Sequence, residues 1–96
     1  MPTYVTLWKY TKDGLMDIKK TNKRFELAKK VVKDAGGKLL SVYGLVGKYD
    51  LMTVMEMPNE KVAAATILKI CSTGRITSQS MIALSLDDFI DITKEV

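Results

Sequence analysis

Hydrophobic and polar positions alternate along residues 3–10, with Val5 and Leu7 on one side of the segment and three aromatic rings on the other. An alternation of period two among β-branched and aromatic residues predicts a β-strand with two usable faces. Residues 11–14 have the composition of a turn, and a short helical turn is expected over residues 15–20.

A helical period replaces this alternation after Thr21 and Asn22, two residue types that commonly cap a helix. The apolar residues that recur on one stripe, opposite a set of lysines, are Phe25, Ala28, Val31, Val32 and Ala35. Their spacing predicts an amphipathic helix. Gly36 and Gly37 are expected to end it, because glycine readily adopts the left-handed conformation that terminates helices.

Two strands, a second main helix, a fourth strand and a terminal helix are expected in the rest of the chain. Periodicity and turn residues place them at 38–44, 49–57, 61–70, 76–84 and 87–93. The first two of these strands should form a hairpin. Asn59 is the expected N-cap of the second main helix, and Gly74 is expected to end it.

This order of elements predicts an α+β fold, a ferredoxin-like βαββαβ sandwich with a four-stranded antiparallel sheet and a C-terminal helix. Right-handed crossovers would place both main helices on one face of the sheet. A chain of 96 residues fits one domain, so residues 1–96 are expected to form a single ferredoxin-like domain.

The opposite face of the sheet is expected to be apolar as well. If aliphatic residues pack under the helices, then Tyr4, Trp8 and Tyr10 face away from them. The third strand is apolar on both sides, so its core set is either Leu51, Thr53 and Met55 or Asp50, Met52, Val54 and Glu56. Because large exposed apolar patches usually mark interfaces, two sheets are expected to pack face to face in a homodimer or a higher oligomer.

Composition limits the chemistry that this chain can perform. Hydrophobic residues make up 47% of it and charged residues 27%, and no apolar run is long enough to span a membrane, so a cytoplasmic protein with no membrane partner is expected. The chain has no histidine and one cysteine, Cys71. Histidine-dependent nucleophilic systems, histidine metal sites and an intrachain disulfide are therefore excluded, and no cofactor or metal is expected.

Charge is unevenly distributed around a formal net charge of +4. Basic residues concentrate over residues 19–33, where Glu26 is the single acid, while the tail from residue 87 to 95 is acidic. The basic stripe could bind phosphate groups, but no recognition motif accompanies it, so a solvated helix face is preferred and nucleic acid is not an expected partner. The two regions could meet across a subunit contact.

The segment Gly47-Lys48-Tyr49-Asp50 and the strand that follows resemble the GYD domain family, named after this Gly-x-Tyr-Asp signature. The resemblance covers nearly the whole chain, because four further segments are similar to the family: Tyr4-Val5-Thr6-Leu7, the turn over residues 14–19, Gly36-Gly37 and the closing residues 83–89. It implies a small prokaryotic protein with a ferredoxin-like structure, related to the dimeric α/β-barrel group, whose biochemical function is unassigned.

Within this signature, Tyr49 and Asp50 are candidate ligand contacts, because a phenol and a carboxylate beside a tight turn could bind a polar ligand. A structural role is preferred, in which Gly47 adopts a positive φ, the Tyr49 ring packs and Asp50 either caps the turn or holds a backbone amide. Adjacent strand residues point to opposite faces, so these two side chains are not expected to serve one site.

Glu56, Trp8, Tyr10 and Tyr43 complete the set of candidate ligand-binding residues. Glu56 could act as a general acid or base if it points into an apolar face, but a position at the rim, paired with a lysine, is preferred. The three aromatic residues could line a ligand pocket, although a role in a subunit interface is preferred.

Two functions remain open at this level. The leading hypothesis is a homo-oligomeric protein without enzymatic activity that binds a small ligand between paired sheets. The alternative is a cofactor-independent enzyme of the dimeric α/β-barrel type, such as a monooxygenase or isomerase, which would use tyrosine or carboxylate groups. The enzyme hypothesis requires Tyr10, Asp50 or Glu56 to line an enclosed pocket.

Overall fold

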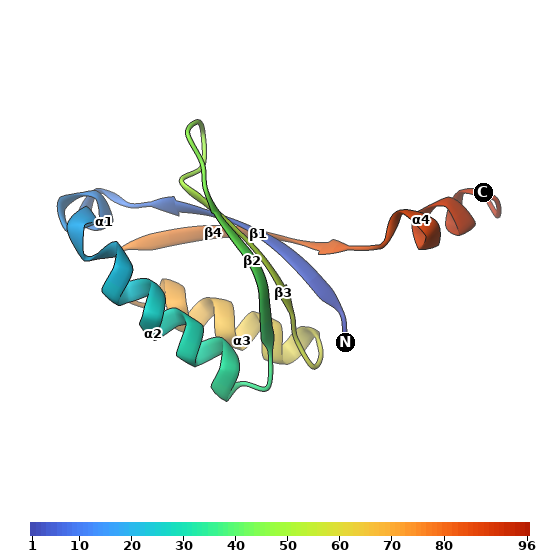
Figure 1. Cartoon of the computed structure of the whole chain (residues 1–96), viewed down its shortest axis with the longest axis horizontal. Coiled ribbons are helices and arrows are strands. Elements are labelled where there is room, and N and C mark those ends of the chain that lie inside the picture. The colour runs from blue at the N-terminus through green and yellow to red at the C-terminus, as the bar shows by residue number, and fades with distance from the viewer.

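The computed structural model describes residues 1–96 as one four-stranded sheet with its two longest helices on one side (Figure 1). The elements in chain order are β1 (Thr3–Tyr10), α1 (Lys12–Met16), the 3₁₀ segment η1 (Ile18–Lys20), α2 (Thr21–Asp34), β2 (Lys38–Gly44), β3 (Leu51–Glu56), α3 (Glu60–Cys71), β4 (Ile76–Ala83) and α4 (Leu86–Thr93). The strands pair antiparallel in the order β2-β3-β1-β4, and α2 and α3 cover the same face. This is the predicted ferredoxin-like βαββαβ sandwich with α4 added at its end.

The aromatic residues of β1 lie on the helix side of the sheet, so the prediction that they face away from the helices was wrong. Tyr4 is 6% exposed and Trp8 is 4% exposed, and the Trp8 indole N–H donates a hydrogen bond of 2.9 Å to Thr53 Oγ1. This bond satisfies the only polar group of the indole, so the ring is buried without leaving an unpaired donor. Aromatic rings bury more apolar area per residue than aliphatic side chains do. Packing Tyr4 and Trp8 under the helices therefore removes more apolar surface from water than packing Val5 and Leu7 there would.

Strand register also decides which alternating set of β3 lies beneath the helices. Met55 pairs with Tyr4, and Thr53 pairs with Thr6, so the odd-numbered residues of β3 share the covered face with the aromatic residues of β1. Met55 is fully buried. The first of the two sets left open by the sequence is therefore the core set.

The core lies between β1, β3 and the facing sides of α2 and α3. Its buried members are Tyr4, Val32, Met55, Met57 and Ala63. Gly37 makes this packing possible, because a Cβ at that position would lie 2.4 Å from the sulfur of Met57. Gly36 has a φ of 83°, the left-handed conformation expected where the helix ends.

Helix α3 begins as the sequence predicted. The Asn59 side chain accepts a hydrogen bond of 2.9 Å from the Val62 backbone N–H, which satisfies one of the free donors at the helix start. Gly74, with a φ of 78°, follows its end. The sequence therefore located both ends of this helix.

The first two helices begin differently from the prediction. The segment expected to be a turn starts α1, because Thr11 Oγ1 accepts from the Gly14 N–H at 3.2 Å and so caps a helix. Neither Thr21 nor Asn22 caps α2. The segment η1 runs directly into α2, so Thr21 is already helical, and its hydroxyl donates to the Ile18 carbonyl at 2.6 Å.

Helix α4 projects from the end of β4, away from α2 and α3 (Figure 1). Ser85 caps it by accepting a hydrogen bond from the Asp88 N–H at 3.1 Å, yet none of its residues is buried. Leu86 and Phe89 are 72% and 55% exposed. None of the helices in the chain combines the length and the apolar character needed to cross a membrane.

Candidate functional site

The sheet face that α2 and α3 do not cover, here called the open face, is apolar along its central strands. Register places the side chains of Val5, Leu7, Met52, Val54 and Met81 together on this face. All five are partly or largely exposed. An apolar surface of this kind on a small domain usually serves as an interface. The sequence therefore predicted an apolar open face correctly but assigned the wrong residues of β1 to it.

Two candidate tyrosines lie at this open face. Tyr43 is 58% exposed and pairs with Met52 across β2 and β3. The Tyr49 hydroxyl donates a hydrogen bond to the side-chain oxygen of Gln79, which is opposite Leu7 on β4. The Lys48 ammonium lies 5.8 Å from the centre of the Tyr49 ring, within the range of a cation–π contact.

Asp50 has the structural role preferred from the sequence. Its carboxylate oxygen Oδ2 accepts a hydrogen bond of 2.8 Å from the Tyr10 backbone N–H, and its own N–H donates to the Trp8 carbonyl at 2.8 Å. Asp50 thus joins the start of β3 to the end of β1, whereas Tyr49 contacts β4. The two signature side chains do not share a site.

Gly47 does not have the positive φ that the sequence predicted for it. The only two glycines with positive φ are Gly36 and Gly74, and a Cβ at Gly47 would meet no atom within 4 Å. Neither backbone conformation nor space requires glycine at this position of the signature.

Glu56 lies at the end of β3, half-buried on the open face. Its cross-strand neighbours are Thr3 and Lys38. None of the four ion pairs in the protein includes it, so the expected pairing with a lysine is absent. No group of three or more cysteine, aspartate or glutamate side chains is placed to hold a metal ion.

A cavity of about 370 Å³ lies between the sheet and the helices α2 and α3. Of the candidate residues, Trp8 and Tyr10 line it, but Tyr43, Tyr49, Asp50 and Glu56 do not. The Tyr10 hydroxyl hydrogen-bonds Thr21 Oγ1 at 2.8 Å. Of the three aromatic residues that could line one pocket, Trp8 and Tyr10 therefore do so and Tyr43 does not.

Ion pairs join the segments next to this cavity. Asp17 Oδ2 lies 3.2 Å from Arg24 of α2 and 3.3 Å from Arg75, which precedes β4. The hydrogen bond from Arg75 holds the pKa of the Asp17 carboxyl below its ordinary value. Desolvation opposes this shift, and the positive charges of Lys20, Arg24 and Arg75 add to it.

Four basic residues line the cavity, namely Arg24, Lys29, Lys69 and Arg75. The sequence indicated the first two only as members of the basic stripe over residues 19–33 and connected none of the four with a pocket. Arg24 and Lys29 flank the apolar stripe of α2, and their helical positions beside Phe25 and Ala28 were a signal that could have found them. The other two come from the end of α3 and the start of β4, and only the packing of those elements brings them to the same cavity.

Comparison with known proteins assigns the family. The model of the GYD domain matches residues 4–93. The chain belongs to the GYD domain family. A relative from Thermus thermophilus, described as a glutamine synthetase and cystathionine beta-lyase binding protein, is 28% identical over 91 residues, which cover 94% of this chain and 96% of the relative.

Solved structures share the fold at low sequence identity. The crystal structure of FFRP-DM1 superposes with a TM-score of 0.61 at 21% identity, over 88% of this chain and all of that chain. The hypothetical protein PHS023 from Pyrococcus horikoshii gives a TM-score of 0.56 at 23% identity, over 88% of this chain and 90% of that chain. The C-terminal domain of MgtC from Mycobacterium tuberculosis gives 0.56 at 10% identity, over 85% and 86%. These similarities establish the fold and not a function.

Proposed function

We propose that this protein is a homodimeric protein-binding module whose two copies associate through their open faces. The apolar row of the open face, which no helix of the same chain covers, is the observation that carries the proposal. Burying such a row against its copy removes apolar surface from water, the main driving force for association. Closed pairs are the commonest assemblies of soluble proteins.

The Thermus relative supports a binding function for the dimer. Its description names two enzymes as binding partners, and it matches this chain over almost its whole length. A metabolic enzyme is therefore the class of partner we propose for this protein. Tyr43, Tyr49 and Glu56 would lie at or beside the dimer interface, where a small ligand between the sheets would contact them.

The enzyme alternative has less support from the geometry. Tyr10 lines the cavity under the helices, but its hydroxyl is engaged with Thr21, and the Asp50 carboxylate is engaged with a backbone amide. Glu56 lies on the opposite face of the sheet. The three groups considered for acid–base chemistry do not converge on one reacting atom, as catalysis would require.

The dimer proposal is tested by placing a charge in the centre of the open face. Val54→Lys puts an ammonium group opposite Val5, where it would be buried without a partner in the dimer. Sedimentation velocity at micromolar concentration is expected to show two chains for the wild type and one chain for this variant. Circular dichroism should show unchanged secondary structure, because the lysine faces solvent in the single chain.

Val46→Lys is the matched control, because Val46 is fully exposed in the loop between β2 and β3 and is not part of the open face. This variant should remain dimeric. A wild-type protein that sediments as one chain, or a Val54→Lys variant that stays dimeric, would contradict the proposal.

A further inference from the structure

We propose that the cavity between the helices and the sheet is a binding site for an amphiphilic carboxylate, a small molecule with an apolar body and one anionic end. This site lies within a single chain, so it goes beyond the proposed dimer and does not depend on it. The volume of about 370 Å³ is in the lower part of the range of roughly 300–1,000 Å³ typical of ligand pockets.

The interior of the cavity suits an apolar body. Thirteen of its 21 lining residues are hydrophobic, with Trp8, Leu51 and Met55 on the sheet and Phe25 and Ile70 on the helices. Protein interiors normally close such space, because apolar side chains gain from contact with one another. A space of this size lined by apolar groups is therefore suited to a ligand that restores those contacts.

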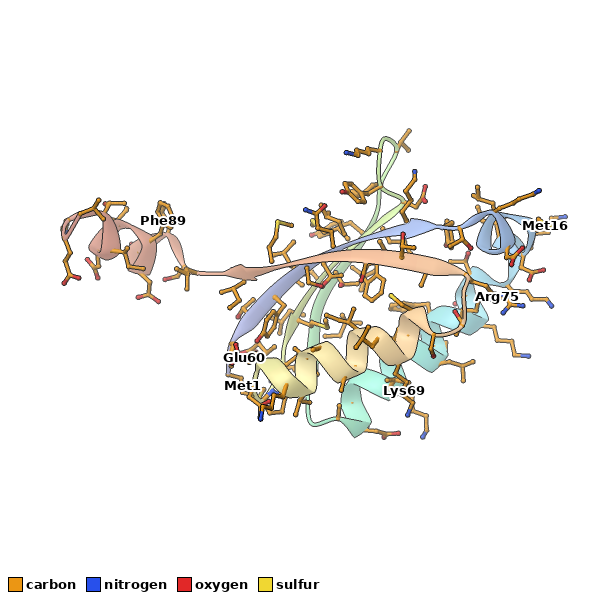
Figure 2. The ribbon with its side chains drawn as sticks, turned by 180° about the vertical axis from the view of Figure 1, so that it is seen from behind. Met1, Met16, Glu60, Lys69, Arg75 and Phe89 are labelled. Carbon is orange, nitrogen blue, oxygen red and sulfur yellow. The ribbon has the colours of Figure 1, made fainter.

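The charged residues of the cavity all have the same sign. Arg24, Lys29, Lys69 and Arg75 line it, and no acidic residue does. Figure 2 shows Lys69 and Arg75 toward the end of the molecule that carries Met16, away from Glu60 and Met1. This arrangement favours a ligand with a negative charge over a neutral or cationic one.

Two of these four cations are available to a ligand. Arg24 and Arg75 are paired with Asp17, but neither Lys29 nor Lys69 has a carboxylate within 4.0 Å. Lys69 has one acidic neighbour beyond that distance, Asp34, whose carboxyl pKa is lowered by Lys30 and to a smaller extent by Lys69. An incoming carboxylate would supply the missing partner for these lysines, with charge-assisted hydrogen bonds that are stronger than neutral ones. The anionic end of the ligand is therefore assigned to Lys29 and Lys69.

Polar contacts link the start of α2 to the rest of the chain at this end of the cavity. Thr21 hydroxyl already donates to Ile18, so the Tyr10 hydroxyl is the donor in the bond that ties the start of α2 to β1. Asp17 ties Arg24 of α2 to the segment before β4. Only Val32, near the far end of α2, is buried in that helix. These contacts therefore fix the position of the first turn of α2, whose Thr21 and Arg24 line the cavity.

Trp8 makes the test direct, because it is the single tryptophan of the chain and lines the cavity. Titration with decanoate is expected to change its fluorescence in a saturable way. Decyltrimethylammonium, which has a chain of the same length but a positive charge, is expected to bind more weakly. A saturable signal from decanoate together with this preference supports the proposal.

Variants then locate the site. Replacing both lysines, in Lys29→Gln with Lys69→Gln, is expected to weaken decanoate binding roughly three- to tenfold, the effect of losing partly exposed charge contacts. Lys61→Gln is the matched control, because this exposed lysine of α3 does not line the cavity. Val54→Lys, which alters the open face, should leave the affinity unchanged.

Three results would overturn the proposal. They are the absence of a saturable response to decanoate, an equal loss of affinity in Lys61→Gln and the double variant, and a loss of affinity in Val54→Lys. The last result would place the ligand between two sheets. Sedimentation velocity tests the proposed dimer, and tryptophan fluorescence tests this binding site. The failure of either proposal can therefore be distinguished from the failure of the other.

Discussion

Asp17 is a residue whose single carboxylate joins two other parts of the chain through ion pairs. It binds Arg24 on α2 and Arg75 before β4, and the pKa of its carboxyl is lowered by the hydrogen bond from Arg75 and by neighbouring positive charges. A lowered pKa in the folded state means that the ionised carboxylate stabilises the fold. This contribution to the free energy of unfolding is complete above the ordinary aspartate pKa of about 4. It is lost as the pH falls through the lower pKa that Asp17 has in the folded state.

We therefore expect Asp17→Asn to lower the melting temperature at pH 7 and to have much less effect in strong acid, where the wild-type carboxyl is protonated too. Thermal unfolding followed by circular dichroism across this pH range measures the difference. Asp91→Asn is a suitable control, since Asp91 pairs with Lys94 alone on the exposed surface of α4. An equal effect of Asp17→Asn at both pH values would contradict this account.

At the scale of elements, α2 and α3 differ in how they begin. Asn59 caps α3 with its side chain, whereas α2 continues from η1 and has no side-chain cap. Asn59→Ala is expected to lower the free energy of unfolding by about 1 kcal/mol, the usual effect of removing such a cap. Denaturant unfolding measures this loss as a lower midpoint with an unchanged slope.

Asn22→Ala serves as the comparison, because Asn22 is an exposed residue in the first turn of α2. The free energy of unfolding should change by less than about 0.5 kcal/mol, as at most surface positions. If the two alanine variants were equally destabilised, then Asn22 would contribute a cap that the structure does not contain.

The whole molecule consists of the helix-covered sheet and a projecting α4. Since α4 has no buried residue, it contributes little to the stability of the rest. In the Val54→Lys background, a chain ending at Ser85 is expected to unfold within about 3 °C of the longer chain, as measured by calorimetry. A larger fall in the melting temperature would mean that α4 packs on its own chain.

The ferredoxin-like order of elements was predictable because it depends on local periodicity. β1 and β2 have the bounds expected from the sequence, and α3 begins at the expected cap. The starts of α1 and α2 were not predictable in the same way. Thr11 and Thr21 both have cap chemistry, and which of them acts as a cap depends on whether the preceding residue is already helical.

The candidate site was predictable only in part. The sequence indicated that Asp50 could hold a backbone amide, because aspartate beside a turn commonly does so, but it did not indicate that the amide belongs to Tyr10 on β1. It did not indicate that Lys69 and Arg75 line one cavity with Arg24, because these residues are brought together by the packing of three elements.

The sequence by itself determined that the sheet has two apolar faces, because both alternating sets of residues in β1 and β3 are largely hydrophobic. Only the tertiary structure decided which set the helices cover. The period of a strand specifies that neighbouring residues point to opposite sides, but it does not specify which side a helix will pack against. Here the large rings of Tyr4 and Trp8 were buried under the helices, and Val5 and Leu7 were left on the open face.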